Sequence, residues 1–445
     1  MTGNFKEKLK RCGKRVLTAM LSGILTMSEI PKVNAENESM ARRHLSKATI
    51  SAKDLSDNIT SYAEGFYNTI KNSYSNSYNT EATALKIGTA AELAVFAKCV
   101  NEGNNFSGKF VKLTADIDLG ETLPSITYEN DTSDIYEMNI SDEASNEWVP
   151  IGETENKPFA GSFNGAGFSV SKMFVNACGD EIVYAGLFGY LDGGKIENLG
   201  IKESSTVVSS SNSNSYAGGV VGYAGCNGMV INCYNEGTVT SKSDSNYFGS
   251  NSYAGGVAGY VGHNSTISNC YNEGTVSSSS HYSASCSGGV AGNIRDGGTV
   301  SNCYNRGRVT SNAYKAYSYA GGVAGQVGNS TIRNCYNEGA TTSVSYDDDS
   351  CMGGVVGYAD DRSVVSDCYN KGTLTPSSIR SYIGGVAGKV GNSTISNCYN
   401  EGSVTCCGIL SYIGGVAGQV GNSKISQCYN EGALIVSNFA HNGFY

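Results

Sequence analysis

The feature that most constrains the fold of this chain is a unit of about 30 residues that recurs along most of its length. The clearest copy, residues 253–276, reads YAGGVAGYVGHNSTISNCYNEGTV. Aligned on the second glycine of its Gly-Gly pair, the copies are 33, 37, 33, 33, 32, 31 and 30 residues apart, at Gly186, Gly219, Gly256, Gly289, Gly322, Gly354, Gly385 and Gly415. The first copy is degenerate, with AGLFG in place of GGVAG. A period in this range predicts a stacked repeat architecture.

The content of the unit decides between the stacked architectures. Each unit has three candidate strands, YAGGVAGYV, STISNCY and GTVTS, separated by Gly or by Asn-Glu-Gly turns. Helical repeats are excluded because no apolar face recurs at 3.6-residue spacing. A propeller blade needs four antiparallel strands in about 40–45 residues. We therefore predict an all-β fold, a right-handed parallel β-helix (a β-solenoid) in which coils stack about 4.8 Å apart.

Several motifs resemble a known repeat family. AGLFGYLDGGKIENLGI (185–201) and the copy at 253–276 resemble the GLUG motif. That motif occurs in bacterial adhesin-like surface proteins and beside the catalytic domain of IgA-specific metallopeptidases. The segments VKLTADIDLG (111–120), WVPIG (148–152) and FAGSFNGAGFSVSKMFV (159–175) resemble the region that leads into such arrays. The resemblance covers residues 87–434 and implies an architecture, since these repeats are scaffold in most of their hosts.

The N-terminal residues 1–35 read as a secretory signal peptide. A basic KEKLKRCGKR segment precedes the short apolar core VLTAMLSGILTM (16–27), and residues 33–35 offer a small-residue cleavage site. The core is too short to span a bilayer, so the protein is expected not to be membrane-spanning. Cleavage removes seven basic and two acidic groups, which changes the formal net charge from −9 to −14. We expect a secreted or cell-surface (extracellular) protein that does not bind nucleic acid or anionic membranes.

Three further segments follow the leader. Residues 36–86 are polar, and Leu55, Ile59, Tyr62, Phe66 and Ile70 keep helical spacing behind a Ser51–Asp54 capping box, so a partly helical segment and a flexible spacer are equally good readings. Residues 87–180 contain a firmer helix. Its capping box is Thr89–Glu92, and its apolar stripe contains Leu93, Phe96, Ala97 and Val100. We predict that this helix caps the first coil, that strands begin near Phe110, and that residues 181–445 form the repeats.

Acidic residues gather in two places. The insert 121–147 has eight carboxylates and no Lys or Arg, and Asp347, Asp348 and Asp349 lie in the variable part of a later unit. Neither has the Asp-x-Asp-x-Asp-Gly spacing of a calcium loop. A solvated loop is the better interpretation of both, and no metal or cofactor is expected.

Stacking lets the units be compared position by position. One column has Leu199 in the first unit and then Cys233, Cys270, Cys303, Cys335, Cys368, Cys398 and Cys428. The leucine indicates that this column points inward. Neighbouring cysteines would lie within disulfide distance, but stacked side chains leave in the same direction, which suits the disulfide torsion badly. We predict a ladder of buried free thiols, with disulfides as the alternative that a secreted protein keeps open.

The three positions after the cysteine form columns of their own. A tyrosine column is followed by an asparagine column running from Asn235 to Asn430, which we expect to bond along the stack and to adopt left-handed turns. The next column reads Glu236, Glu273, Arg306, Glu338, Lys371, Glu401 and Glu431. We interpret Arg306 and Lys371 as relief of repulsion between glutamates, worth only about 0–1 kcal/mol per exposed pair.

The inventory for catalysis is small. The four histidines, His44, His263, His281 and His441, do not form an H-E-x-x-H motif, so the metallopeptidase activity found beside related repeats is not expected. His263 and Lys389 replace small or polar residues at predicted turns, but each is alone. We therefore predict a non-enzyme with no catalytic, cofactor-binding or metal residues.

Three functions remain in competition. The leading hypothesis is an adhesin-like repeat protein whose Tyr-rich and Ser/Asn-rich walls offer aromatic faces and hydrogen bonds to an extracellular glycan or protein. The alternatives are a carbohydrate-active β-helix enzyme (a polysaccharide lyase or hydrolase) and a structural stalk. No helical or charged cap follows the last unit, so we also predict end-to-end self-association through residues 412–445, with Leu434, Val436 and Phe439 in the contact.

Overall fold

The computed structural model describes residues 65–66, 68–70, 80–120, 125–129, 137–141, 147–244, 249–378, 380–406 and 410–436. The chain divides into two compact units. One comprises residues 1–68 with 124–143, and the other comprises residues 69–123 with 144–445. The predicted signal peptide and most of the predicted polar segment lie outside the described residues. Residues 65–66 and 68–70 of that segment are helical, as one of the two readings expected.

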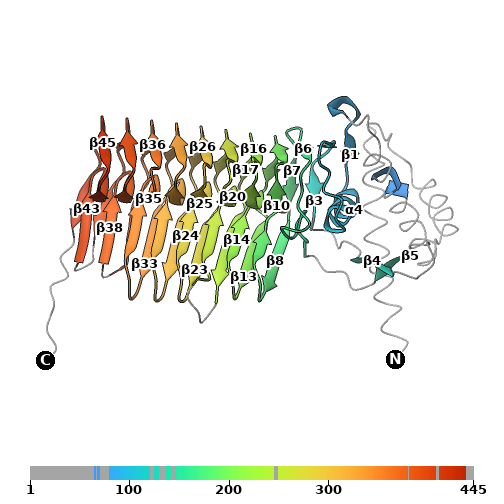
Figure 1. Cartoon of the computed structure of the whole chain (residues 1–445), viewed down its shortest axis with the longest axis horizontal. Helices are drawn as coiled ribbons and strands as arrows, with labels where there is room; N and C mark the ends of the chain where they lie inside the picture. Colours follow the sequence, from blue (N-terminus) through green and yellow to red (C-terminus); the bar gives the residue numbers. More distant parts are fainter. Residues whose placement is uncertain are drawn as a thin grey trace, which may run out of the picture. The chain divides into compact units, whose positions relative to one another are not determined.

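The larger unit is a parallel β-helix, which confirms the predicted fold class (Figure 1). Each coil contributes one strand to each of five sheets, except that coil 6 contributes a single bridge residue, Leu374, to the fifth, and we number these sheets by their order within a coil. Corresponding repeat positions pair in register, so Tyr216 faces Tyr253 and Asn235 faces Asn272. We number eight coils, each running from its first-sheet strand to its fifth-sheet position: 183–211, 215–243, 252–280, 285–313, 318–345, 350–374, 380–406 and 410–436.

The first two sheets have eight strands each. The first sheet consists of β9 (Val183–Ala185), β14 (Ser215–Gly218), β19 (Ser252–Gly255), β24 (Ser285–Gly288), β29 (Ser318–Gly321), β34 (Ser350–Gly353), β38 (Arg380–Gly384) and β43 (Leu410–Gly414). The second consists of β10 (Phe188–Asp192), β15 (Val221–Gly225), β20 (Ala258–Val261), β25 (Ala291–Arg295), β30 (Ala324–Gly328), β35 (Val356–Asp360), β39 (Ala387–Gly391) and β44 (Ala417–Gly421).

The third and fourth sheets begin before the repeats and therefore include entry strands. The third has eleven strands: β1 (Leu85–Ile87), β2 (Phe110–Leu113), β6 (Ser162–Asn164), β11 (Lys195–Glu197), β16 (Met229–Ile231), β21 (Thr266–Ser268), β26 (Thr299–Ser301), β31 (Thr331–Arg333), β36 (Val364–Ser366), β40 (Thr394–Ser396) and β45 (Lys424–Ser426). The fourth has ten: β3 (Ile117–Asp118), β7 (Ser169–Ser171), β12 (Gly200–Ile201), β17 (Tyr234–Asn235), β22 (Tyr271–Asn272), β27 (Tyr304–Asn305), β32 (Tyr336–Asn337), β37 (Tyr369–Asn370), β41 (Tyr399–Asn400) and β46 (Tyr429–Asn430).

The fifth sheet is the least regular. Its six-stranded part consists of β8 (Phe174–Gly179), β13 (Thr206–Ser211), β18 (Thr238–Ser243), β23 (Val276–Ser280), β28 (Val309–Ala313) and β33 (Thr341–Ser345). Single bridges through Leu374 continue it to the pair β42 (Val404–Cys406) and β47 (Leu434–Val436).

Five strands per coil replace the three that were predicted. The predicted strand YAGGVAGYV is divided at its Gly-Gly pair. The backbone of this pair lies so close to neighbouring residues that no side chain would fit there. A Cβ on Gly256 would lie 2.3 Å from Asn272 Cγ, and one on Gly255 would lie 1.9 Å from a carbonyl oxygen. The second predicted strand is divided at the Asn-Cys step, where Asn269 has a φ of 55°. Such left-handed residues cannot continue a strand, so the chain turns there into the next sheet.

The core of the solenoid is apolar on most sides and polar on one. Inward Val, Ile, Ala and Cys side chains are buried along the second, third and fourth sheets. Between the fifth and first sheets, buried serine hydroxyls bond to one another instead, as in Ser241 with Ser252 at 2.9 Å and Ser311 with Ser318 at 3.0 Å. Because buried hydroxyls need partners, this ladder holds the two sheets in a specific register.

A helix covers the core at the N-terminal end of the array, as predicted. Helix α4 (Ala90–Asn101) begins at a capping box in which Thr89 Oγ1 accepts from Glu92 N at 3.2 Å, and Glu92 Oε2 accepts from Thr89 N at 3.1 Å. Its Phe96 is fully buried and contacts the rings of Phe159 and Phe163. Both of these rings contact Phe188 in coil 1, so the helix continues the core.

Two expectations about the entry region were wrong. Strands begin at Leu85 and not near Phe110, because β1 precedes α4 and pairs in parallel with β2. The 3-10 turn η1 (Glu81–Thr83) leads into it. The acidic insert also contains an antiparallel hairpin of β4 (Ser125–Glu129) and β5 (Glu137–Ser141) where a loop was expected. Its β-branched and aromatic residues favour extended backbone despite the charge.

No helix among the described residues is long and apolar enough to cross a membrane.

Candidate functional site

The cysteine column lies inside the solenoid, as predicted. Its members are free thiols, six of them buried and Cys428 partly exposed. Each Sγ donates to the carbonyl two residues earlier, as Cys303 does to Ser301 at 3.1 Å, and the Cys270 N–H donates to Cys303 Sγ at 3.4 Å. Burial raises the pKa of the Cys270 and Cys303 thiols. Buried neutral thiols are poor nucleophiles and poor metal ligands, so this column is structural.

The asparagine column also lies inside and bonds along the stack. Asn305 Nδ2 donates to Asn337 Oδ1 at 2.8 Å, and Asn305 Oδ1 accepts from Asn272 Nδ2 at 2.8 Å. The expected left-handed conformation was assigned to the wrong asparagine. These residues lie in strands, whereas the residue before each cysteine is left-handed, as in Asn302 with a φ of 54°.

The charged column forms ion pairs on the outer surface, as predicted. Arg306 lies 3.2 Å from Glu273 and 2.8 Å from Glu338, and Lys371 lies 3.3 Å from Glu401. All of these side chains are at least one-third exposed. Exposed pairs of this kind contribute at most about 1 kcal/mol each, so they relieve repulsion and do not form a reaction centre.

The tyrosine column of the fourth sheet is partly exposed, but its ring faces are covered. Neighbouring rings from Tyr234 to Tyr429 stack with centroids 4.8–5.1 Å apart and planes within 8° of parallel. Each face therefore packs on the next ring, and the ladder presents ring edges and hydroxyls to solvent. The expectation that these walls offer aromatic faces is wrong for this column, because the coil spacing matches the stacking distance of the rings.

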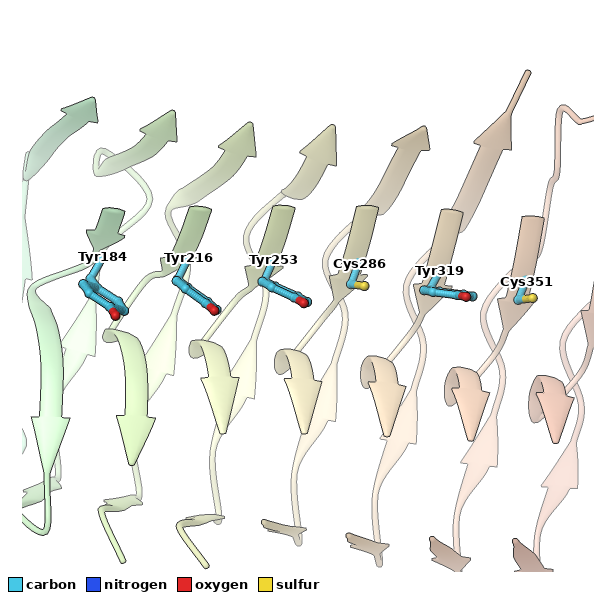
Figure 2. Packing of buried hydrophobic residues seen from close by; sticks show 6 residues of the cluster. All are labelled: Tyr184, Tyr216, Tyr253, Cys286, Tyr319 and Cys351. Carbon is cyan, nitrogen blue, oxygen red and sulfur yellow. The ribbon is translucent and has the colours of Figure 1, made fainter. Parts of the chain in front are cut away.

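A second group of tyrosines fills the angle between the outer faces of the first and second sheets. Figure 2 shows one column of it, with one side chain on each of six coils: Tyr184, Tyr216, Tyr253, Cys286, Tyr319 and Cys351. The other column packs edge-on against it, as in Tyr216 with Tyr223 at 5.5 Å and 88°. Tyr216 and Tyr253 are only 8% exposed, and burial raises the pKa of both hydroxyls. These rings therefore hold two sheets together and are inaccessible to a large ligand.

Coils 4–7 interrupt this tyrosine packing with smaller and polar residues. Cys286 and Asn293 stand in coil 4 where earlier coils have two tyrosines, and Lys389 takes a tyrosine position in coil 7. Lys389 lies on strand β39 and not at a turn as predicted, with Nζ 5.0 Å from the ring centroid of Tyr382. Cys286 is fully buried, so the replacement opens no pocket.

A group of accessible aromatic side chains, with one lysine among them, lies on the turns between the fifth sheet and the next first-sheet strand. We call them the aromatic loop cluster, consisting of His281, Tyr282, Tyr314, Lys315, Tyr317 and Tyr346. Tyr314, Tyr317 and Tyr346 are 46%, 43% and 62% exposed. Backbone pairing between the turns, such as Lys315 N to His281 O at 2.8 Å, aligns them in successive coils.

Two ring pairs of the cluster are tilted, whereas His281 stacks on Tyr282 at 4.6 Å and 26°, and Tyr317 stacks on Tyr319 of the buried column. His281 and Tyr314 lie 4.8 Å apart at 55°, and Tyr314 and Tyr346 lie 5.6 Å apart at 48°. Lys315 Nζ lies 5.0 Å from the centroid of the Tyr282 ring and 5.8 Å from that of Tyr314. Tilted rings leave part of each face open, so the cluster combines accessible aromatic faces with a cation and hydroxyl groups.

Carboxylates border the cluster on the coil 5 turn. Asp348 and Asp349 lie near Tyr317, and the Asp348 carboxylate is the main cause that raises the pKa of the Tyr317 hydroxyl. Asp347 is exposed, in agreement with the predicted solvated acidic loop. Arg380 Nη1 lies 3.9 Å from Asp349 Oδ1. The described residues contain no group of three or more His, Cys, Asp or Glu side chains that could hold a metal ion.

Comparison with known proteins identifies the repeats. The family model of the GLUG motif matches residues 213–240, 250–277, 316–343, 348–375 and 380–405. Five of the eight coils therefore match the GLUG motif. The chain is also similar to the solved structure of a presumed immunoglobulin A1 protease from Bacteroides ovatus, with 18% sequence identity, a TM-score of 0.42, and coverage of 78% of this chain and 85% of that chain. No curated protein matches the chain in sequence.

The segments that match the GLUG motif contain few residues of the candidate site. Five of the six cluster residues, all except Tyr317, lie outside the matched segments. Coil 4, which carries Cys286 and Asn293, is also unmatched. The aromatic loop cluster therefore lies almost entirely on inserts outside the matched segments.

Sequence reasoning did not identify the aromatic loop cluster. His281 was noted as a single histidine and the tyrosines of the inserts were not singled out. The usable signal was the presence of Tyr or His at the start of the insert in three successive coils, at 281, 314 and 346. His263 lies at a left-handed turn with a φ of 52°, while His44 and His441 lie outside the described residues.

Proposed function

We propose that this GLUG protein is an extracellular, adhesin-like binding protein without catalytic activity, and that the aromatic loop cluster contacts its glycan or protein ligand. The observation that carries the proposal is the concentration of exposed aromatic rings on these turns, most of them outside the segments that match the GLUG motif. Loops held on a rigid scaffold are the usual position for binding residues. Tyrosine is well suited to this role because it offers a large contact area with few rotatable bonds.

The extracellular location rests on two features. The leader of residues 1–35 has the pattern of a secretory signal, and GLUG repeats resemble those of surface proteins. The chemistry of the cluster suits a carbohydrate: open tyrosine faces pack against the C–H groups of a sugar ring, while Lys315 and the aspartates bond to its hydroxyls. A protein surface rich in polar groups would use the same residues.

Binding of the chain from residue 36 onward to a glycan and mucin array tests the proposal, with retention and release of products scored separately. We expect retention without product release. Tyr314→Ala and Tyr346→Ala should each weaken binding by about fivefold or more, as for a central interface tyrosine. Tyr336→Ala, which removes a ring from the stacked fourth-sheet ladder, is the matched control and should leave binding unchanged.

The competing functions predict other results. Product release that persists in the wild type would identify a carbohydrate-active enzyme. Retention of no ligand, or equal loss in the Tyr336→Ala control, would leave a structural stalk as the better description and refute a role for the cluster.

A further inference from the structure

A polar groove lies at the turns between the second and third sheets of coils 6–8. The aromatic loop cluster lies at a different turn of the coil, between the fifth sheet and the next first-sheet strand. It has a volume of about 650 Å³ and is lined by Arg362, residues 392–394, Val420 and residues 422–424. Two of the lining side chains, Arg362 and Lys424, are cationic, and none is acidic. The formal net charge of the chain is −9, so the positive charge of this groove is opposite in sign to that of the protein as a whole.

Both cations depart from the repeat at positions where most other coils have Asn or Thr. Arg362 takes the turn position filled by Asn227, Asn264, Asn329, Asn392 and Asn422. It adopts a left-handed backbone with a φ of 66°, which asparagine tolerates far better than arginine does. Lys424 pairs in register with Thr394, in a third-sheet column that reads Lys195, Met229, Thr266, Thr299, Thr331 and Val364 in coils 1–6.

The two cations lie on either side of coil 7. They are two coils apart along the stack, which is roughly 10 Å at the usual strand spacing. Coil 7 supplies the floor between them, where Asn422 Nδ2 donates to Asn392 Oδ1 at 2.6 Å. That bond orients the Asn392 amide so that its Nδ2 group remains available for a ligand, together with the Thr394 hydroxyl. The groove thus offers several donors between two positive charges.

Arg362 and Lys424 have no carboxylate partner among the described residues. Cations beside the fourth sheet do have such partners, as shown by Lys202 with Glu236 at 3.3 Å and Arg306 with Glu338 at 2.8 Å. Asp361 precedes Arg362 but does not line the groove. Two unpaired cations that share a donor-rich groove are complementary to an anion with several oxygen atoms.

We propose that this groove binds the anionic oxygen group, carboxylate or sulfate, of an acidic sugar. Arg362 and Lys424 bind the charged oxygens from opposite sides, and Asn392 and Thr394 bond to the neighbouring hydroxyls of the sugar. The inference is independent of the proposed function, because its residues lie on different sheets and in different turns from the aromatic loop cluster.

The test is calorimetric titration of the chain from residue 36 onward with an oligogalacturonate, its neutral methyl ester and a sulfated disaccharide. We expect binding of the carboxylated sugar, the sulfated sugar or both, no binding of the ester, and weaker binding at higher salt. The variant Arg362→Asn/Lys424→Thr restores the residues of the repeat, so it should fold normally and bind at least about tenfold more weakly.

The control Lys242→Ser/Arg333→Ser removes two exposed cations elsewhere and also restores repeat residues. It changes the net charge by the same amount and should bind as the wild type does. Equal weakening in both double variants, equal binding of the ester, or no binding of either acidic sugar would overturn the proposal. Tyr314→Ala should leave this titration unchanged, which separates the groove from the proposed function of the cluster.

Discussion

Replacing Asn305 by alanine tests the view that the buried asparagine column holds the coils together. Asn305 is completely buried in coil 4 and makes four side-chain hydrogen bonds. Its Nδ2 donates to Gly307 O at 2.9 Å and to Asn337 Oδ1 at 2.8 Å. Its Oδ1 accepts from Gly307 N at 3.1 Å and from Asn272 Nδ2 at 2.8 Å. The substitution removes all four bonds at a site that water does not reach.

The expected loss of stability follows from these contacts. Each intramolecular hydrogen bond contributes about 0.5–1.5 kcal/mol net, so four give about 2–6 kcal/mol. The neighbouring groups keep other partners: Asn272 still donates to Gly274 O at 2.8 Å, and Asn337 Oδ1 still accepts from Gly339 N at 3.1 Å. The buried Gly307 carbonyl loses the Asn305 Nδ2 donor, so we expect a loss of at least about 3–4 kcal/mol.

Stacked coils contact only their neighbours, so this loss should be concentrated in coils 3–5. Amide hydrogen exchange reports such local opening, and about 3 kcal/mol corresponds to a decrease in protection of roughly a hundredfold. Denaturant unfolding gives the accompanying global change. Asn312→Ala removes the same side chain from the outward, partly exposed face of β28 and should change stability by no more than about 0.5 kcal/mol. A result for Asn305→Ala as small as that for Asn312→Ala would refute the reasoning.

Four other predictions concern the core, the titrating tyrosines and the ends of the array. Burial raises the pKa of Tyr190 and Tyr260 from the usual value of 10 to about 12, so the unfolded chain loses these protons at lower pH than the folded chain does. Stability measured by denaturant unfolding should therefore fall as pH rises from about 10 through 12, and constant stability across that window would contradict the burial. The six buried thiols of the cysteine column should be protected in the native protein, and all seven should be alkylated without reductant after denaturation. Failure to label them would indicate disulfides. Phe96→Asp places a charge among fully buried rings, so it should lower the free energy of unfolding by more than about 3 kcal/mol and expose the amides of residues 110–113 to hydrogen exchange. Unchanged protection of these amides would refute the placement of the helix over the core. Coil 8 exposes three apolar side chains, since Leu434, Ile435 and Val436 are 45%, 48% and 61% exposed, so we propose that this coil associates end to end. Sedimentation should show concentration-dependent dimers that Val436→Lys abolishes. A monomeric wild type at tens of micromolar would exclude the contact.

The sequence by itself determined the architecture, because the information that specifies a solenoid is repeated in every unit. Recurrence of Gly-Gly and Cys-Tyr-Asn in coils 2–8 places these residues above their own kind, and parallel in-register pairing then follows. The leucine at 199 was enough to orient the cysteine column inward, and Thr89 with Glu92 was enough to start helix α4.

Some features needed the backbone in three dimensions. The Gly-Gly pair reads as part of one strand in the sequence, and only the contact distance from Gly256 to Asn272 shows why the chain must bend there. Strand β1 was missed because three residues carry too little periodicity to distinguish a strand from a spacer. Its identity comes from pairing with β2, whose partner residues are 26 positions away.

The candidate sites were decided almost entirely by the tertiary structure. The sequence marks tyrosines without showing which of their faces are covered. Stacking at 4.8–5.1 Å closes the fourth-sheet ladder, whereas the turns that follow the fifth sheet tilt Tyr314 and Tyr346 and leave them open. The groove between Arg362 and Lys424 joins residues 62 positions apart, each a single exception in its own repeat. Periodicity determines what is common to every coil, while binding surfaces arise from exceptions, and only the stacked coils show which exceptions become neighbours.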